Sequence, residues 1–346
     1  MLAKVIEPET TCPARYDSWT RHQLATARRA LAWAAFWAVL AAAGAVTITA
    51  ALPGVGNLAA AVVVGLWALW NLAWLVGLRR QYRFLRSPAL DRPWRPLPAA
   101  TVARRHKLFR IVVYTESGSL VLAELNDDHA RIVQARGRIW LCGTDRRFAV
   151  VRCDGKVEAK ALTILDEPVP DAEEIAAREV PPDSPAEDPA VLQLRRESIV
   201  GFWGQWAAGL VGMLLGAGVI ALSVAPFQLA GVVAGAIVVF GGLVASLQRQ
   251  PKDARRAIEL LTTATHWTPL TIQRNWQAVL PRYSVQHGDR KLWVTLHEVG
   301  RDLEASITAT GTLWVAGDPD GGEAAIGLPG YPATGLARFG AWPTLD

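Results

Sequence analysis

Few residues in this chain have the types and spacing that catalysis needs. His297 and Glu298 begin like the helical motif of zinc proteases, in which a second histidine stands four residues after the first. Arg301 occupies that position, so this zinc site is excluded. The other histidines are scattered, and neither a phosphate-binding glycine loop with its lysine nor a Ser-His-Asp set can be assembled by motif.

Among the three cysteines, Cys142 is the next candidate, as a nucleophile or a redox sensor. Cys142 lies between Leu141 and Gly143 in a strand-like run, and a matching run later in the chain has Ala316 at this position. A position that accepts either Cys or Ala is typical of a small core residue. Cys12 and Cys153 are not spaced from it as metal ligands would be, so we predict free thiols in a reducing compartment.

An acidic cluster surrounds Gly321 and Gly322. Asp318, Asp320 and Glu323 loosely suggest calcium ligands, but their spacing is too short for a calcium-binding loop. A glycine-rich β-turn explains the pattern better. We therefore predict no catalytic residue, no cofactor and no metal site. The sequence leaves enzymatic activity open and favours a protein that is not an enzyme.

Two long stretches without charged residues are the main feature of the rest of the sequence. No Asp, Glu, Lys, Arg or His occurs in 30–78 or in 198–248, which are 49 and 51 residues long. A helix needs about 20 apolar residues to cross a bilayer, so each stretch is expected to hold two spans and a turn. Pro53 and Pro226 mark the turns and divide the stretches into predicted spans at about 30–52, 56–78, 200–223 and 228–248.

Basic residues flank the predicted spans and indicate their orientation. Because cytoplasmic loops carry an excess of Lys and Arg, both termini and the middle region are expected in the cytoplasm. Arg outnumbers Lys 30 to 6, which suggests a bacterial source, so the predicted location is a bacterial plasma membrane crossed by several helices. The residues expected to face anionic lipid head groups are Arg79, Arg80, Arg83, Arg86, Arg249 and Lys252.

Small and polar residues inside the predicted spans are candidates for helix packing. Gly212 and Gly216, and likewise Gly231 and Gly235, form small-xxx-small patterns that let helix backbones approach closely. The patterns favour packing within the chain and leave self-association or a partner's helix open. Asn71 is expected to form an interhelical hydrogen bond, since the spans carry no carboxylate or histidine for an ion or proton relay.

The chain consists of two copies of one unit. Trp94-Arg-Pro-Leu and Trp267-Thr-Pro-Leu are 173 positions apart, and the run from Gly137 matches the run from Gly311 at a shift of 174. Half of 346 is 173, so the repeat fills the chain. The predicted parts are a cytoplasmic flank at 1–29, a transmembrane hairpin at 30–78, a β domain at 79–165, an acidic Pro-rich linker and flank at 166–197, a second hairpin at 198–248 and a second β domain at 249–346.

Each soluble region shows short apolar runs separated by turns, which is typical of a small antiparallel sheet or barrel. Arg255–Thr265 predicts a short helix, and the tail from Gly327 is expected to be irregular. The predicted fold class is an α+β membrane protein with four transmembrane helices in two hairpins, each followed by a small cytoplasmic antiparallel β domain. The strand candidates are Leu108–Thr115, Leu120–Leu125, Arg138–Cys142, Phe148–Arg152, Val157–Leu165, Leu292–His297, Leu303–Thr308 and Thr312–Ala316.

The two soluble regions differ in charge. Residues 79–167 hold 18 Lys and Arg against 10 Asp and Glu, a net charge of +8, whereas 249–346 hold 10 of each kind. We expect the first region to dock on an acidic surface, either anionic lipid head groups or a protein. The net charge of +5 on the whole chain is attributed to the basic flanks rather than to nucleic-acid binding.

These features favour a multi-pass membrane scaffold or accessory subunit that displays two cytoplasmic β domains for partner or lipid-surface binding. The expected partners are membrane lipids with anionic head groups and another protein or a second copy of the chain. A channel or transporter component is the second hypothesis. An enzyme that acts on a lipid-linked substrate at the cytoplasmic face is the third.

Overall fold

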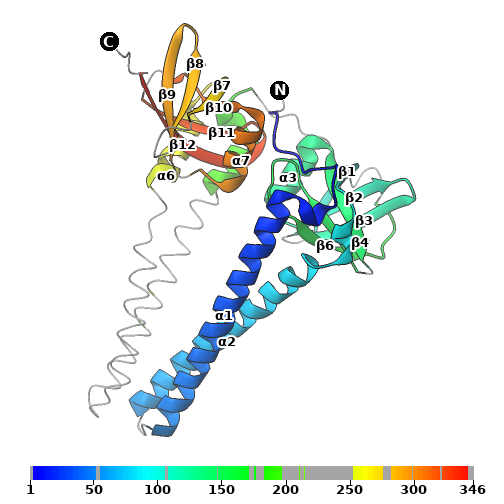
Figure 1. Cartoon of the computed structure of the whole chain (residues 1–346), viewed down its shortest axis with the longest axis vertical. Helices are drawn as coiled ribbons and strands as arrows, with labels where there is room; N and C mark the ends of the chain where they lie inside the picture. The colour runs from blue at the N-terminus through cyan, green and yellow to red at the C-terminus, as the bar shows by residue number, and fades with distance from the viewer. Residues whose placement is uncertain are drawn as a thin grey trace. The chain divides into compact units, whose positions relative to one another are not determined.

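The chain forms two compact units (Figure 1). One unit contains Met1–Arg21, Ser87–Ser198 and Pro251–Asp346, and the other contains His22–Arg86 and Ile199–Gln250. The computed structural model describes residues 3–51, 55–105, 108–145, 147–170, 175–176, 183–196, 210, 214, 252–275, 282–297, 299–319 and 322–341.

Two long helices make up the described part of the second unit. Helix α1 (Ser18–Ala51) has its first residues in the other unit, and α2 is Val55–Phe84. The two helices pack closely at Gly44, where an added Cβ would lie 3.8 Å from the side chain of Val64. Large apolar side chains of α1 remain exposed, and the rings of Trp33 and Trp37 stack with their centroids 6.4 Å apart.

The predicted four-helix, multi-pass membrane architecture is wrong, and so is the predicted location in a plasma membrane. Helices α1 and α2 lie where two of the spans were expected, but within the described part of the chain no helix combines the length and the apolar character needed to cross a bilayer. The prediction took absence of charge as strong hydrophobicity. Ala is the most abundant residue of α1, and a small side chain such as Ala removes little apolar surface from water. The other two predicted spans, at 200–223 and 228–248, lie outside the described residues apart from 210 and 214.

The first barrel is a closed ring of six antiparallel strands (Figure 1). Its strands are β1 (Arg95–Arg105), β2 (Leu108–Thr115), β3 (Gly118–Leu125), β4 (Arg138–Asp145), β5 (Phe148–Arg152) and β6 (Lys160–Leu165). They are ordered β1-β2-β3-β6-β5-β4, and β4 pairs with β1 to close the ring. Closure leaves no free sheet edge. Alternate residues of each strand point inward, so Ile111, Ile139 and Leu162 are buried in the core.

The second barrel repeats the first. Its strands are β7 (Trp267–Asn275), β8 (Arg282–His287), β9 (Arg290–His297), β10 (Thr312–Ala316), β11 (Glu323–Leu328) and β12 (Tyr331–Ala341). Their order around the ring is β7-β8-β9-β12-β11-β10, which is the strand order of the first barrel. Helix α6 (Lys252–Thr263) precedes β7 and packs Leu261 against Ala325 and Leu336.

A helix joins the third and fourth strands of each barrel. These helices are α3 (Asp127–Arg136) and α7 (Arg301–Thr310). Each ends at a glycine in the left-handed region, Gly137 with φ 69° and Gly311 with φ 65°, which an L side chain adopts only at a cost. Helix α3 buries Ile132 and Val133 in the common core at the end of the barrel where β3 finishes and β4 begins.

Two local predictions in the second copy are wrong. Leu303–Thr308 was expected to be a strand, but it lies inside α7, because a short apolar run has no periodicity that separates helix from strand. The tail from Gly327 was expected to be irregular, but Tyr331–Ala341 is β12. Its glycines sit beside bulky groups: an added Cβ on Gly340 would lie 2.3 Å from the Trp293 ring.

Part of the predicted 166–197 linker is structured. Ala176 donates its backbone N–H to the carbonyl of Thr101 at 2.9 Å, and Ile175 forms a bridge to Val102 of β1. The short helix η4 (Pro185–Glu187) leads into helical residues 189–196. Asp188 stands at the start of this helix, and its side chain accepts hydrogen bonds from two backbone N–H groups, that of Ala190 at 2.9 Å and that of Gly330 at 2.6 Å.

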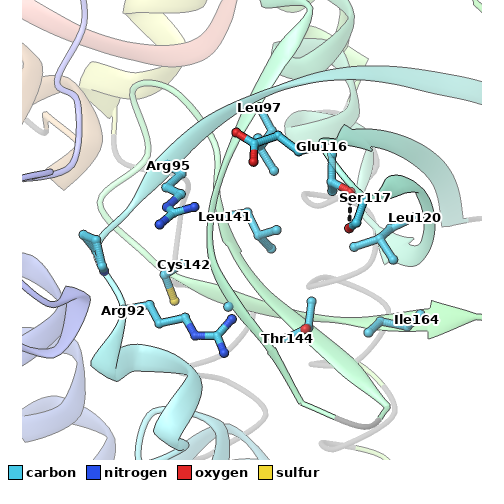
Figure 2. A pocket seen from close by; sticks show the side chains of 13 residues that line it. Arg92, Arg95, Leu97, Glu116, Ser117, Leu120, Leu141, Cys142, Thr144 and Ile164 are labelled. Carbon is cyan, nitrogen blue, oxygen red and sulfur yellow. Dashed lines mark hydrogen bonds between the residues drawn. The ribbon is translucent and has the colours of Figure 1, made fainter.

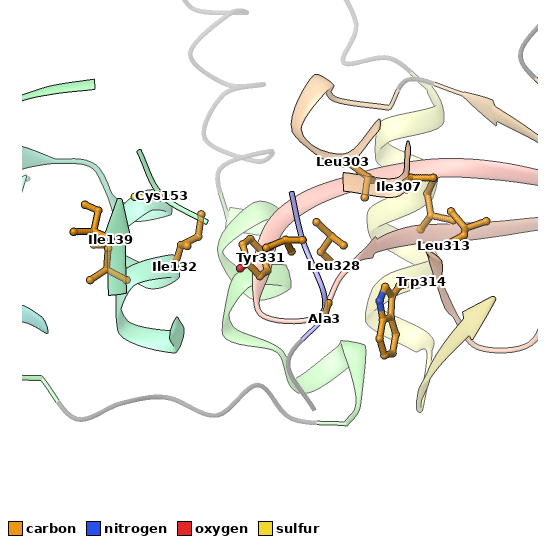
Figure 3. Packing of buried hydrophobic residues seen from close by; sticks show 14 of the residues in the cluster. Ala3, Ile132, Ile139, Cys153, Leu303, Ile307, Leu313, Trp314, Leu328 and Tyr331 are labelled. Atoms are coloured by element: carbon orange, nitrogen blue, oxygen red, sulfur yellow. The ribbon is translucent and has the colours of Figure 1, made fainter. Parts of the chain in front are cut away.

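An extended segment at the N-terminus, residues 3–17, contacts both barrels, and we refer to it as the N-terminal strap. The Ile6 carbonyl accepts from the Gly155 N–H at 3.2 Å, and the Ile6 N–H donates to Ser306 Oγ at 3.4 Å. Ala3 is fully buried beside Leu328 and Tyr331 (Figure 3). The strap therefore takes part in the hydrophobic cluster that the two barrels share.

Buried charges hold the strap to the first barrel. Arg152 and Asp17 are 1% and 3% exposed, and their Nη1 and Oδ2 atoms lie 3.2 Å apart. The same Asp17 oxygen accepts the backbone N–H of Thr20 at 3.0 Å, which caps the start of α1. Asp154 has no exposed surface and accepts from Trp140 Nε1 at 2.5 Å.

Polar contacts also join the two barrels. Arg136 of α3 donates through Nε to the hydroxyl of Tyr331 at 2.5 Å and through Nη2 to the carbonyl of Ala3. Asp302 of α7 accepts the backbone N–H of Val157 at 2.9 Å and pairs with Lys156 Nζ at 3.1 Å. The barrels thus share ion pairs and hydrogen bonds as well as apolar contacts.

We expect replacement of Arg152 by Met to lower the free energy of unfolding by about 3–5 kcal/mol, because Asp17 is then a buried charge without its ion-pair partner. Arg15→Met is the matched control, since Arg15 pairs with Asp91 at the surface and such pairs contribute about 1 kcal/mol or less. Urea unfolding followed by circular dichroism measures both changes. Equal losses for the two variants would contradict the assignment of the buried pair.

A second prediction concerns acid. Burial, and then the charges of Lys160 and Lys156, lower the pKa of His129 from 6.5 to about 2. Below pH 6.5 the unfolded chain therefore binds a proton at this residue that the folded chain does not bind. The contribution of the residue to the free energy of unfolding is fully present above that pH and falls as the pH drops below it. Between pH 7.5 and 5.5 this residue should cost about 1.4 kcal/mol of unfolding free energy. His129→Gln should lose that part of the pH dependence in urea titrations, and an unchanged dependence would refute the assignment.

Candidate functional site

Cys142 and Cys153 both lie in buried positions. Cys142 is in β4, and its thiol donates to the carbonyl oxygen of Ala89 at 3.5 Å. Burial raises the pKa of the Cys142 thiol to about 12 and does the same for Cys153. Since the thiolate is the nucleophile, both groups are inert at neutral pH.

Two histidines among the described residues each pair with an acidic side chain. His297 Nδ1 lies 3.9 Å from Asp253, and His266 Nε2 lies 3.5 Å from Asp318. Asp320, the second acidic residue of the turn, lies outside the described residues. Across the part of the chain that the structure describes, no three His, Cys, Asp or Glu side chains gather closely enough to hold a metal ion.

The predicted lipid-facing arginines of the first copy lie on α2 or directly after it. Arg79, Arg83 and Arg86 line a hollow of about 540 Å³ together with Tyr82 and Leu31. The Arg86 guanidinium is 5.7 Å from the centre of the Tyr82 ring. Their contact with lipid stays a prediction, as do the roles of the residues whose side chains or positions fall outside the described part: Asn71, Arg80, Gly212, Gly216, Gly231, Gly235, Arg249 and Lys252.

A second hollow, of about 580 Å³, lies at one end of the first barrel, and we refer to it as the barrel mouth (Figure 2). The start of β1, the turn between β2 and β3, the end of β4 and the end of β6 surround it. Helix α3 is at the other end of the barrel, where β3 finishes and β4 begins. The mouth is thus the end of the barrel that α3 leaves open.

The inward faces of the strands form the floor of the mouth. Leu97 lies two residues before Ala99 on the inner face of β1, and Leu141 lies two residues after Ile139 on β4. Leu120 of β3 and Ile164 of β6 continue the inner faces of their strands in the same way. These four leucine and isoleucine side chains are partly buried, so the floor is apolar and accessible at once.

Two arginines stand beside this floor. Arg95 is the first residue of β1, paired with Leu141, and its position continues the inward face of Leu97. Arg92 follows the short helix η2 (Pro88–Asp91), which begins where the Ser87 side chain accepts the Ala89 N–H at 3.2 Å. In Figure 2 both guanidinium groups lie on one side of the mouth, while Leu120 and Ile164 lie on the other.

The backbone around Arg92 is held on two sides. The N-terminal strap donates the Ala14 N–H to the Arg92 carbonyl at 2.9 Å, and Pro13 forms a bridge to Pro93. Helix η2 packs on β4 so closely that a Cβ on Gly143 would lie 2.7 Å from the Ala89 oxygen. The backbone of Arg92 is therefore well positioned at the mouth.

Neither guanidinium at the mouth has an ion-pair or hydrogen-bond partner among the described residues. Other arginines of this barrel do: Arg110 lies 2.5 Å from Glu167, and Arg138 lies 2.7 Å from Asp154. Unpaired guanidinium groups beside an accessible cavity can each offer a planar fork of donors to an anion. The arrangement suits capture of a negatively charged group.

Hydroxyl groups add further donors around the opening. Thr115 Oγ1 donates to the Gly118 carbonyl at 2.6 Å and lies 3.2 Å from Ser117 Oγ, which orders the turn between β2 and β3. Thr144, on the rim, is exposed. Glu116 occupies the same turn and places one negative charge at the rim.

The second barrel supplies a comparison within the same chain. Strand pairing sets Thr268 opposite Val315, as Arg95 is set opposite Leu141, so Thr268 is the equivalent of Arg95. Thr268 Oγ1 donates to the Gly317 carbonyl at 2.9 Å and is thereby occupied. The equivalent of Arg92 at the offset of 173 is Thr265. The fold is repeated, but the pair of arginines is not.

Sequence reasoning missed this pair, although a signal was present. The motif Trp-X-Pro-Leu occurs in both copies, with Arg95 in one and Thr268 in the other. Such a change of charge inside an otherwise repeated motif indicates that the fold does not require an arginine at this position. The +8 charge of the first region pointed to the correct copy, but it could not distinguish paired from unpaired arginines.

Thiol reactivity tests this description of the core. Iodoacetamide at pH 7.5 should modify Cys12, which is half-buried, well before Cys142 and Cys153, whose pKa values burial raises to about 12. All three should react in urea. Mass spectrometry of peptides measures the order, and fast native modification of Cys142 would show that this part of the mouth is open to solvent.

Comparison of the chain with protein-family models, with curated proteins and with solved structures finds no match in any of the three.

Proposed function

We propose that this protein is a binding or accessory protein whose first barrel captures an anionic group of a ligand or partner at its mouth. The observation that carries the proposal is the pair Arg92 and Arg95, which have no partner among the described residues and lie on one side of an accessible cavity. Such a guanidinium group can bind a matching anion through charge-assisted hydrogen bonds without breaking an existing ion pair.

Binding rather than catalysis fits the chemistry of the mouth residues. Cys142 is protonated at neutral pH because burial raises its pKa to about 12, and the other polar lining groups are hydroxyls, arginines and one carboxylate. These groups can hold and orient a ligand. Two positioned groups that could exchange a proton with it are missing from this set of lining residues.

The second barrel and the strap support the binding barrel. The shared hydrophobic cluster and the contacts of Arg136 and Asp302 attach one barrel to the other. A barrel of this size gains stability from such an attachment, because small domains bury a smaller fraction of their surface than larger ones do. The duplication thus allows one copy to specialise while the other keeps the fold.

Inorganic pyrophosphate is a suitable probe for the proposed site, since it is compact and carries several negative charges. Isothermal titration at low salt should show binding to the full chain. Arg92→Ala and Arg95→Ala should each weaken it roughly 10- to 100-fold, because a hydrogen bond to a charged group contributes about 1.5–3 kcal/mol. Binding should also weaken as salt rises.

The control is Arg131→Ala on α3, which removes the same charge at the other end of the barrel. In a titration at about 0.1 M salt, where the Debye length is about 10 Å, it should leave the affinity for pyrophosphate within about twofold of wild type, because a charge at the opposite end of the barrel is then largely screened. If the Arg92→Ala/Arg95→Ala double variant binds pyrophosphate as well as Arg131→Ala does, the mouth is not the anion site.

A further inference from the structure

We propose that the ligand of the barrel mouth is a phosphate monoester with an apolar body, in which the two mouth arginines hold the phosphate and the apolar floor covers the rest. This inference rests on the proposed function and adds the class of ligand. It draws on three features of the mouth: the number of free guanidinium groups, the accessible apolar floor, and the position of the single carboxylate.

The first feature favours phosphate over carboxylate. A carboxylate has two oxygens and one charge, so it satisfies one guanidinium fork. A phosphate monoester has three free oxygens and close to two charges near neutral pH, so it can accept from two guanidinium groups at once. Arg92 and Arg95 are both unpaired among the described residues and both turn to the same side of the mouth, as Figure 2 shows.

The second feature requires an apolar part. Leu97, Leu120, Leu141 and Ile164 are all partly buried on the core and open to the cavity. Accessible aliphatic surface in a hollow is a source of affinity, because a ligand that covers it removes apolar area from water. A bare inorganic anion would leave this surface wet. The cavity volume of about 580 Å³ lies within the range of sites that enclose drug-sized molecules.

The third feature argues against an extended polyanion. Glu116 stands on the β2–β3 turn at the rim, and no described arginine or lysine pairs with it. Its charge repels a second anionic group placed across the opening. A ligand with one compact anionic end beside the arginines and a neutral body elsewhere avoids that repulsion. A nucleic-acid backbone, which has a charge at each nucleotide, does not.

A series of alkyl phosphates tests the assignment. Isothermal titration of the full chain with methyl, butyl and hexyl phosphate should give affinities that rise by roughly fourfold for each added methylene until the floor is covered. Hexanoate should bind at least about tenfold more weakly than hexyl phosphate, because it engages one guanidinium fork. Arg92→Ala/Arg95→Ala should lose most of the affinity for every phosphate in the series.

Leu120→Asn tests the floor separately, with Leu292→Asn as its matched control. Leu120 pairs with Val113 and Leu292 pairs with Val285, so the two leucines occupy equivalent positions in the two barrels. Leu120→Asn should flatten the rise of affinity with chain length. Leu292→Asn, in the other barrel, should leave the affinities of the whole series as in wild type. If Leu120→Asn does not fold, the wild-type series alone decides.

The possible outcomes separate this inference from the proposed function. Equal affinity for methyl and hexyl phosphate, with loss of both in the arginine variant, would overturn the apolar body and leave the anion site in place. Hexanoate binding as tightly as hexyl phosphate would overturn the choice of phosphate and again leave the anion site. If neither the phosphates nor pyrophosphate bind in an arginine-dependent way, both proposals fail.

One further arm identifies the source of the phosphate ester. The full chain is mixed with phosphatidylcholine vesicles that contain or lack phosphatidic acid, and vesicle-bound protein is separated by flotation. Arginine-dependent flotation with phosphatidic acid, together with the alkyl series, supports a lipid as the source. Arginine-dependent binding of hexyl phosphate without flotation supports a soluble ester.

Discussion

The buried ion pair between Arg152 and Asp17 is the constraint on which the first barrel and its mouth depend. Each of these groups would be costly to bury alone, and the pair is tolerated because Asp17 also accepts two bonds from Thr20 and Arg152 donates to the Lys156 carbonyl at 2.6 Å. The pair connects a strand of the barrel, the strap and the start of α1. The strap in turn bonds the backbone of Arg92, so the position of the mouth arginine follows from a charge pair in the core.

The second barrel has the fold without this chemistry. Trp140 is paired with Arg152, whereas the equivalent Trp314 is paired with Gly327, so the buried arginine has glycine as its counterpart. Asp188 occupies the role of Asp17 at the start of a helix but bonds to the Gly330 backbone rather than to a charged side chain. The buried ion pair therefore occurs in the same copy as the mouth arginines, which have no partner within the described part of the chain. The second copy supplies apolar contact, through Tyr331 and the shared core.

The membrane prediction shows where composition misleads. A stretch without charge satisfies one condition for a span, but the transfer free energy depends on the apolar area of its side chains. A helix rich in alanine, such as α1, meets the first condition much more easily than the second. The same lesson applies to the strand predicted at Leu303–Thr308, which is helical in α7: a short apolar run is compatible with either period, and the flanking glycines and tertiary contacts decide.

The sequence by itself determined the repeat offset, the position of several strands such as Leu108–Thr115 and Phe148–Arg152, and the excess of positive charge in the first copy, because each is a local or additive property of the chain. Tertiary structure alone decided that each sheet closes into a barrel and that α3 leaves one end open. It also decided that Arg92 and Arg95, unlike Arg138 and Arg110, have no carboxylate partner among the described residues. Closure and pairing join residues far apart in the chain, such as Arg95 with Leu141 and Arg152 with Asp17. No periodicity within one segment encodes such partners, so the candidate site became visible only when the strands were placed side by side.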